Sequence, residues 1–270
     1  MKKNRLVLIL PSYDPYKDLF DIFVRQLKKN WPDRPFPLVI ANMHFDYEGE
    51  NAYVINCGNE RNQMKRIKKA VEQFDADYYF ILEDDRIIMN RVDTEEIYKI
   101  LDFMDNEKIP YFRSNASVIK KKKKDLFHGY SHYYHILAKE PYGVTGSTVI
   151  WSKNLILQIL NNFEDAYAFE AYQVKKSALS KERWYENYAT YDSNLLHIVH
   201  CIEKQKWIPS SRKKMLKEGV DLSNDKREIQ SVQERTVVFI KYIFLRVPGF
   251  VRHGVKKLGK MFGIQFSTDY

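Results

Sequence analysis

Residues 77–85, Asp-Tyr-Tyr-Phe-Ile-Leu-Glu-Asp-Asp, join a run of large apolar side chains directly to three acids. The apolar run is typical of a strand buried on both faces of a parallel sheet. Open α/β sheets bind ligands beyond the carboxyl ends of their strands, where these acids would lie. In an extended chain, Glu83 and Asp85 point one way and Asp84 the other. We therefore expect Glu83 and Asp85 to hold Mn²⁺ or Mg²⁺ on a diphosphate, because these ions prefer oxygen ligands and bridge carboxylates to phosphates.

Asp84 would then support the other two acids or face a bound sugar. The alternative is an exposed acidic turn that pairs with Arg86 or Arg91. The strand-like run before the triplet favours a binding site over such a turn.

Strands and helices alternate through the first half of the chain. Apolar runs predict strands at 5–10, 37–41, 52–56 and 77–82, and helical spacing predicts helices at 19–27 and 59–74. Three prolines between 32 and 37 end the first helix. This alternation predicts an α/β fold with a mostly parallel sheet flanked by helices.

The second half is less regular. We expect helices at 94–104, 155–160 and 191–203, and strands at 109–113 and 143–151. Five consecutive lysines at 120–124 predict a solvated loop, and the polar stretch 210–234 is linker-like or partly helical. We place one domain at 1–225 and a separate tail at 226–270.

Composition excludes several classes of protein. The 270 residues are 44% hydrophobic, which excludes a mainly disordered chain. Only two cysteines are present, so a reducing cytosol is the expected compartment. No targeting signal or apolar run of transmembrane length is visible.

The net charge of +9 is concentrated at the C-terminus, where residues 236–270 carry six basic side chains and one acid. In this tail, apolar residues at helical spacing alternate with lysine and arginine. That pattern predicts an amphipathic helix lying on an anionic membrane surface. The alternative is a helix docked on the domain. Charge gathered in a tail, rather than spread over a domain, argues against nucleic-acid binding.

The order of several motifs resembles GT-A type glycosyltransferases, especially bacterial enzymes that build capsule and other surface polysaccharides. The pieces are the strand ending in Pro11-Ser-Tyr-Asp14, the helix at 59–70, the acidic triplet, the glycine-containing stretch 142–150, Tyr191-Asp-Ser-Asn-Leu-Leu196, and the segments 207–211 and 218–223. The resemblance covers about residues 5–225. It implies a GT-A (Rossmann-like) fold, with Glu83 standing where the family's Asp-x-Asp motif has its first Asp.

The resemblance also implies a donor site. Its residues would be Pro11, Ser12, Tyr13 and Asp14 around the nucleoside, and Arg61, Gln63 and Arg66 near the diphosphate or sugar. Tyr13 could stack on the base, while Asp14 could bond the base or ribose. The alternatives are an ordinary turn in which Asp14 caps the next helix, and positive charges that are simply solvated.

An inverting transfer needs a base for the acceptor hydroxyl. Asp192, at the start of the expected helix 191–203, is the first choice, and Asp165 the second. Either acid could instead be a helix cap, and a retaining mechanism stays open. Histidines 128, 132 and 135 with tyrosines 130, 133 and 134 predict an acceptor or sugar platform, or a loop packed on the sheet. No histidine occurs in 210–223 that could complete a metal shell.

The resemblance implies transfer of a sugar from a nucleotide-diphosphate donor, expected to be a UDP-sugar, to a glycan or undecaprenyl-diphosphate-linked acceptor. The protein would be cytoplasmic and peripheral at the inner face of the cell membrane. One alternative is a nucleotidyltransferase, although the first loop lacks the glycine-rich basic sequence expected of one. Another is a non-enzymatic basic module that binds membrane or nucleic acid.

Overall fold

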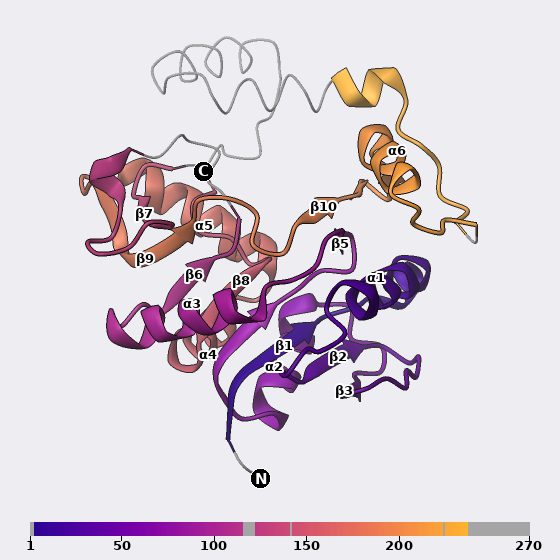
Figure 1. The fold of residues 1–270 in the computed structure, drawn as a ribbon, viewed down its shortest axis with the longest axis horizontal. Helices are drawn as coiled ribbons and strands as arrows, with labels where there is room; N and C mark the ends of the chain where they lie inside the picture. Colours follow the sequence, from indigo (N-terminus) through magenta and orange to yellow (C-terminus); the bar gives the residue numbers. More distant parts are fainter. Residues whose placement is uncertain (1–2, 116–121, 141, 224, 237–270) are drawn as a thin grey trace.

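A computed structural model describes residues 3–115, 122–140, 142–223 and 225–236. Its centre is an eight-stranded sheet with the order β3-β2-β1-β4-β8-β6-β9-β7 (Figure 1). The strands are β1 (Asn4–Leu10), β2 (Leu38–Asn42), β3 (Ala52–Asn56), β4 (Ala76–Ile81), β6 (Tyr111–Arg113), β7 (Tyr133–Leu137), β8 (Val149–Ser152) and β9 (Trp184–Tyr191). The predicted α/β fold with a mostly parallel sheet is confirmed.

The first four strands are all parallel. Leu8 of β1 lies beside Leu38 of β2 on one side and Phe80 of β4 on the other. These side chains are almost fully buried, as a strand with helices on both faces requires. The carboxyl ends of β1, β2 and β4 therefore meet at one edge of the sheet.

β8 interrupts this order, because it runs antiparallel to both β4 and β6. β6 and β9 are again parallel, and β7 closes the sheet antiparallel to β9. Because β8 is antiparallel to β4 and β6 is antiparallel to β8, β6 and β9 run in the same direction as β4 and end at the same edge.

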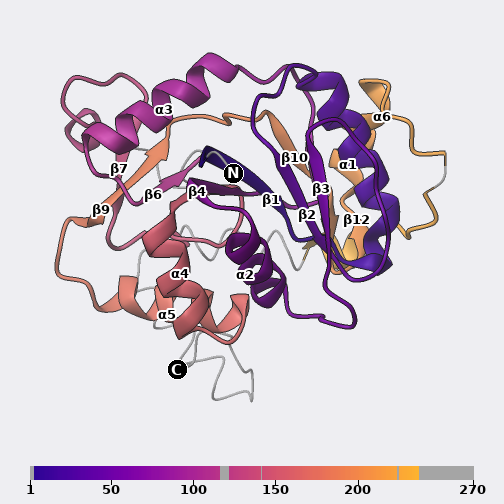
Figure 2. The same ribbon diagram turned by 90° about the horizontal axis from the view of Figure 1, so that it is seen from below.

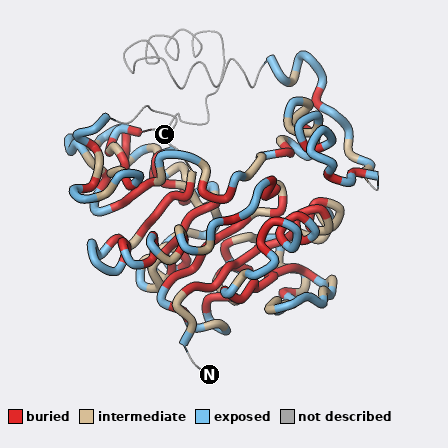
Figure 3. Tube along the Cα trace, in the orientation of Figure 1, coloured by how far each residue is buried: buried red, intermediate tan, exposed pale blue. Residues whose placement is uncertain are grey.

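Helices cover both faces of the sheet (Figure 2). They are α1 (Lys17–Asn30), α2 (Gln63–Gln73), α3 (Thr94–Asn106), α4 (Lys153–Asn162), α5 (Ala166–Leu179) and α6 (Pro209–Lys217), with short 3-10 turns η1 (Asp14–Tyr16) and η2 (Lys123–Asp125). One core gathers α1 and α3 on the face of Leu6 and Leu8, and the other gathers α2, α4 and α5 on the face of Val7 and Ile9. The central strands between them are almost continuously buried (Figure 3).

The helix expected at 191–203 is wrong. The chain leaves β9 at Tyr191, turns, and forms β10 (Ile198–His200), which pairs antiparallel with β5 (Arg86–Ile88). The Asn194 side chain closes the turn by bonding the backbone N–H and C=O of Ile198. The short segment Ile198–His200 pairs with β5 as a strand, so this tertiary pairing overrides the helical spacing of the apolar residues in 191–203. A small hairpin follows, made of β11 (Ile202–Glu203) and β12 (Lys206–Trp207).

Other boundaries also move. α2 begins at Gln63 because the Asn62 side chain accepts hydrogen bonds from the N–H groups of Met64 and Lys65 and so caps the helix there. The strand expected at 143–151 is restricted to β8. Within the described residues, no helix is both long enough and apolar enough to cross a bilayer. The predicted membrane-surface helix at 236–264 lies almost entirely outside those residues.

Candidate functional site

The acidic triplet lies just beyond β4, at the edge where the parallel strands end. Asp84 and Asp85 form a turn, so the extended geometry that we expected to align Glu83 with Asp85 is wrong. The Arg86 N–H donates a hydrogen bond to the Glu83 carbonyl at 3.2 Å and so closes the turn that leads into β5. Each of the three acids consequently has its own partner.

Asp84 connects the triplet to the first loop. Its carboxylate is buried and accepts a hydrogen bond from the Ser12 hydroxyl at 2.7 Å. Burial, aided by repulsion from Asp85 and Glu83, raises the pKa of Asp84 to about 7, and the Ser12 hydrogen bond partly opposes this. Asp84 therefore supports the site from inside rather than facing a ligand.

Asp85 meets a histidine from β10. Its Oδ2 lies 3.2 Å from the Nε2 of His200, and the Asp85 carbonyl accepts a hydrogen bond from the Cys201 N–H at 2.9 Å. The Asp85 Oδ1 is buried and has no hydrogen-bond partner among the described residues. Sequence reasoning assigned 191–203 to a helix, took His200 as a structural residue of that helix, and sought a late histidine for a metal only in 210–223.

A divalent cation fits these residues only if water or a bound substrate supplies its other ligands. The described part of the chain contains no cluster of three or more His, Cys, Asp or Glu residues arranged to hold a metal by themselves. Asp85 and His200 offer two ligands, and the buried Asp85 Oδ1 has no hydrogen-bond partner among the described residues. Mg²⁺ and Mn²⁺ usually complete such a set with water and substrate phosphate oxygens.

Glu83 faces the other side of the turn. Its carboxylate pairs with the Arg86 guanidinium and lines a cavity of about 230 Å³ beside Glu170 of α5. Burial, with repulsion from Glu83, raises the pKa of Glu170, and Arg86 opposes the shift. The pairing of Glu83 with Arg86 is the contact that the alternative of an acidic turn predicted, although here it borders a cavity.

The first loop, 11–16, is anchored to the second strand. Asp14 accepts hydrogen bonds from the N–H groups of Met43 and His44, at 2.9 and 3.0 Å, and does not cap the helix that follows. The half-exposed Tyr13 ring lies next to Tyr16, with centroids 5.9 Å apart. The loop is therefore held rigid, with two aromatic rings beside the buried Ser12.

The three side chains expected from the second helix have different surroundings. Arg66 is buried and donates hydrogen bonds to the carbonyls of Pro11, Glu60 and Arg61, so its guanidinium fixes the loop. Arg61 precedes α2 and is exposed. Gln63 opens α2 and lines the cavity that Glu83 shares.

A segment after α6 returns to this loop. The Arg227 guanidinium pairs with both Asp18 carboxylate oxygens at 2.7 Å, and its carbon lies 4.4 Å from the centre of the Tyr16 ring. It also donates to the Pro15 carbonyl at 3.1 Å. These contacts join residues on the two sides of the boundary that we predicted after residue 225.

The two candidate bases differ in role. Asp165 is the N-cap of α5, because its carboxylate accepts a hydrogen bond from the Ala168 N–H at 2.7 Å. Asp192 follows a strand, not a helix start, and its Oδ2 lies 2.8 Å from the Nδ1 of His132. Because β9 runs parallel to β4 but three strands away, Asp192 lies about 14 Å along the edge from the triplet.

The predicted platform of histidines and tyrosines is divided between packed and exposed rings. The His135 ring stacks against Phe127 and Trp184, at centroid distances of 3.6 and 4.2 Å. Tyr130 and Tyr133 both pack on Phe103. The alternative of a loop packed on the sheet thus accounts for three of the six rings, while His128 and His132 are exposed.

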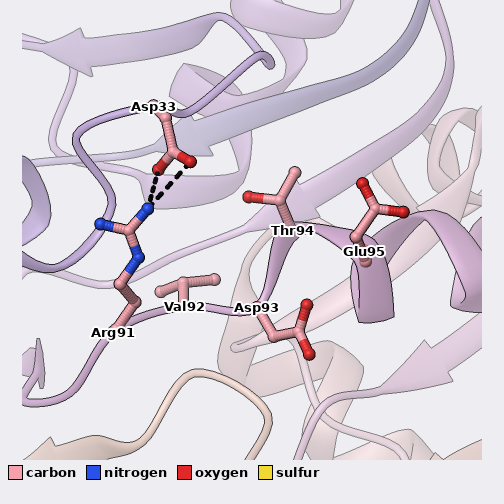
Figure 4. A pocket seen from close by; sticks show the side chains of 6 residues that line it. All are labelled: Asp33, Arg91, Val92, Asp93, Thr94 and Glu95. Carbon is pink, nitrogen blue, oxygen red and sulfur yellow. Dashed lines mark hydrogen bonds and ion pairs between the residues drawn. The ribbon is translucent and has the colours of Figure 1, made fainter.

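A second, wider pocket of about 370 Å³ lies at the start of α3 (Figure 4). Three of its charged groups already have structural roles, and the fourth, Glu95, is exposed. Arg91 pairs with both oxygens of Asp33, and Asp93 caps α3 through the Glu96 N–H. It brings no titratable group to the acidic triplet, so the triplet's edge of the sheet is the stronger candidate site.

No family model matches the sequence, and no curated protein matches it significantly. Residues 1–349 of S. aureus TarS align at 13% identity over 69% of this chain and 60% of that chain, with a TM-score of 0.44. The same protein in complex with UDP-GlcNAc aligns at 16% identity over 69% and 58%, with a TM-score of 0.43. The 2-C-methyl-D-erythritol 4-phosphate cytidylyltransferase of Thermus thermophilus aligns at 8% identity over 74% and 94%, with a TM-score of 0.41.

This chain thus spans about 60% of the length of the TarS chain that it matches. Because every one of these TM-scores is below 0.5, function has to be inferred from the residues of this chain.

Proposed function

We propose that this protein is a glycosyltransferase that moves a sugar from a UDP-sugar to a hydroxyl of a lipid-linked or growing surface glycan. The observation that carries the proposal is the meeting of Asp85 and His200 at the carboxyl edge of the sheet, with one Asp85 oxygen buried and partnerless among the described residues. Such a pair suits a cation that is shared with a diphosphate.

The adjoining loop supplies the rest of a donor site. Asp84 and Ser12 tie the triplet to the rings of Tyr13 and Tyr16, which offer stacking surface for a nucleoside. A bound Mn²⁺ or Mg²⁺ would stabilise the charge of the departing diphosphate. Asp85 and His200 would hold that ion, while Glu83 would lie on the side of the turn that faces the cavity.

The proton of the acceptor hydroxyl would be taken by Asp192 or Asp165. Asp165 opens α5, whose Phe169 and Glu170 share a cavity with Glu83. Asp192 lies farther along the edge but is paired with an exposed imidazole. Asn variants of each, assayed for transfer with the UDP-sugar that binds best, separate the two: the true base loses transfer while donor binding stays unchanged.

Calorimetric titration with UDP and Mn²⁺ tests the donor site. The wild type should bind UDP only when Mn²⁺ is present, and Asp85→Ala should abolish this binding. Glu95→Ala, which removes an exposed acid from α3, is the matched control and should bind like the wild type. Failure of UDP to bind would refute the proposal, and binding of CTP with release of pyrophosphate would replace it with nucleotidyl transfer.

The acceptor and membrane partners are part of the same proposal. Residues 236–270 combine apolar residues at helical spacing with six basic side chains, which suits an anionic bilayer surface. Deletion of 237–270 should abolish co-sedimentation with anionic vesicles, and neutral vesicles should bind neither form. Equal binding of the full chain and the deletion would contradict attachment through the tail.

A further inference from the structure

The cavity beside Glu83 is lined mainly by apolar side chains. Most of its wall is aliphatic or aromatic, from α2, β4, β8, α4 and α5; the residues include Met64, Ile67, Ile81, Trp151, Ile156 and Phe169. Its polar groups are fewer, namely the carboxylates of Glu83 and Glu170, the Tyr167 hydroxyl, Gln63 and Ser147. Such a lining suits a ligand with an apolar body and few polar contacts.

Glu83 and Glu170 are not equivalent within this cavity. Arg86 holds the Glu83 carboxylate. The described residues give the Glu170 carboxylate no hydrogen bond, and burial, with repulsion from Glu83, raises its pKa against the attraction of Arg86. A half-buried carboxylate with free lone pairs is an acceptor for a ligand hydroxyl, since leaving it unbonded costs free energy.

The location connects the cavity to the donor site. Glu83 belongs to the triplet, so a ligand in the cavity lies against the same turn that carries Asp85. A volume of about 230 Å³ corresponds to roughly eight water-sized groups. That is the size of a short aliphatic chain or an acyl substituent, and sugar rings with many hydroxyls would leave most of their polar groups unbonded here.

We propose that this cavity is an acceptor subsite that takes an apolar group lying a few bonds from a hydroxyl, with Glu170 accepting the hydrogen bond of that hydroxyl. The inference rests on the proposed function, because only a transferase needs an acceptor at this edge. It narrows the acceptor to molecules with an aliphatic or acyl group near the site of transfer.

Gly146 allows the cavity to be filled without disturbing the fold. A Cβ built on Gly146 meets no atom within 4 Å, and the residue lines the cavity. Gly146→Leu therefore places a side chain in the empty space, and Gly146→Ala is its matched control. Glu170→Gln keeps the shape of the side chain and removes its charge.

Two glucosides serve as probes in calorimetry, hexyl β-D-glucoside and methyl β-D-glucoside, which differ only in their apolar group. The wild type and Gly146→Ala should bind the hexyl compound at least tenfold more tightly than the methyl compound. Gly146→Leu should lose that preference, and Glu170→Gln should weaken hexyl glucoside binding at least threefold. Equal binding of the two glucosides by the wild type, or an unchanged preference in Gly146→Leu, would overturn the inference.

Titrations of the same proteins with UDP and UDP-glucose in Mn²⁺ separate this inference from the donor proposal. Gly146→Leu should bind both nucleotides like the wild type. If it keeps UDP but loses UDP-glucose, the cavity belongs to the donor sugar and the acceptor assignment is wrong. If the wild type binds hexyl glucoside selectively but no nucleotide, the cavity remains a ligand site and the proposed transfer reaction fails.

Discussion

His200 Nε2 lies 3.2 Å from the Oδ2 of Asp85, because β10 pairs with β5 and places His200 opposite Arg86. The pairing of β10 with β5 thus brings a histidine from the second half of the chain to the acidic turn that follows β4. Neither residue is fully buried, with side-chain exposures of 41% for His200 and 24% for Asp85. Both side chains are therefore partly accessible, although the Oδ1 of Asp85 is itself buried.

His200→Asn should weaken Mn²⁺-dependent UDP binding by about tenfold or more, because one of two protein ligands is lost. His197→Asn is the matched control, since His197 lies in the same segment, is exposed, and has a positive φ of 49° that asparagine tolerates. Calorimetry measures both variants. An equal loss in the two variants would show that the segment, and not the imidazole, is responsible.

Asp84→Asn should stabilise the metal-free protein at neutral pH. In the folded state the pKa of Asp84 is raised to about 7, while an aspartate in the unfolded chain has a pKa of about 3.9. Between these values the folded protein keeps a proton that the unfolded chain has released, so raising the pH destabilises the wild type. The advantage of the variant should grow by up to about 1.4 kcal/mol per pH unit and level off above pH 7.

Urea unfolding of both proteins in EDTA between pH 5 and 8 measures this difference, and the titrations of groups that do not interact with Asp84 cancel. The asparagine carbonyl can still accept the Ser12 hydrogen bond, so packing is preserved. A difference that stays constant over this range would mean that Asp84 titrates normally.

Arg227→Ala should cost about 1–3 kcal/mol of unfolding free energy, because it removes two hydrogen bonds to a partly buried carboxylate and the contact with Tyr16. Arg91→Ala is the comparison, because Arg91 also bonds both oxygens of one aspartate but is 64% exposed, against 12% for Arg227. That exposed pair should contribute at most about 1 kcal/mol. Urea denaturation ranks them, and equal costs would refute the importance of burial.

Asp165→Ala should destabilise the protein by about 1 kcal/mol, since it removes the N-cap of α5. Asp192→Ala should cost less, because its pair with His132 is exposed. Thermal unfolding checks the order. If Asp192→Ala proves the more damaging of the two, its contact with His132 holds the fold, and any loss of transfer in that variant would have to be attributed to unfolding.

The sequence was sufficient to predict the strands in the first half of the sheet. It was insufficient to predict β10, the strand that brings His200 to the candidate site. Strands such as 5–10 are predictable because their side chains are buried by helices on both faces, which leaves a continuous apolar signal. The region 191–203 carries apolar residues that fit helical spacing equally well, and only its pairing with β5 makes it a strand. His200 was therefore placed on the wrong element, while the positions of the triplet and of Ser12 at the ends of their strands could be inferred locally.

The pairing of β10 with β5 also has a consequence during synthesis. All eight strands of the main sheet are complete once β9 ends at Tyr191, yet His200, Cys201 and Arg227 follow it. A nascent chain can therefore assemble its sheet with the acidic turn still uncovered, since domains begin to fold from the N-terminal side as they emerge. This last stretch must leave the ribosome before Asp85 gains its histidine, and it also carries Leu196, Trp207 and Met215, which complete the core on the α1 face of the sheet.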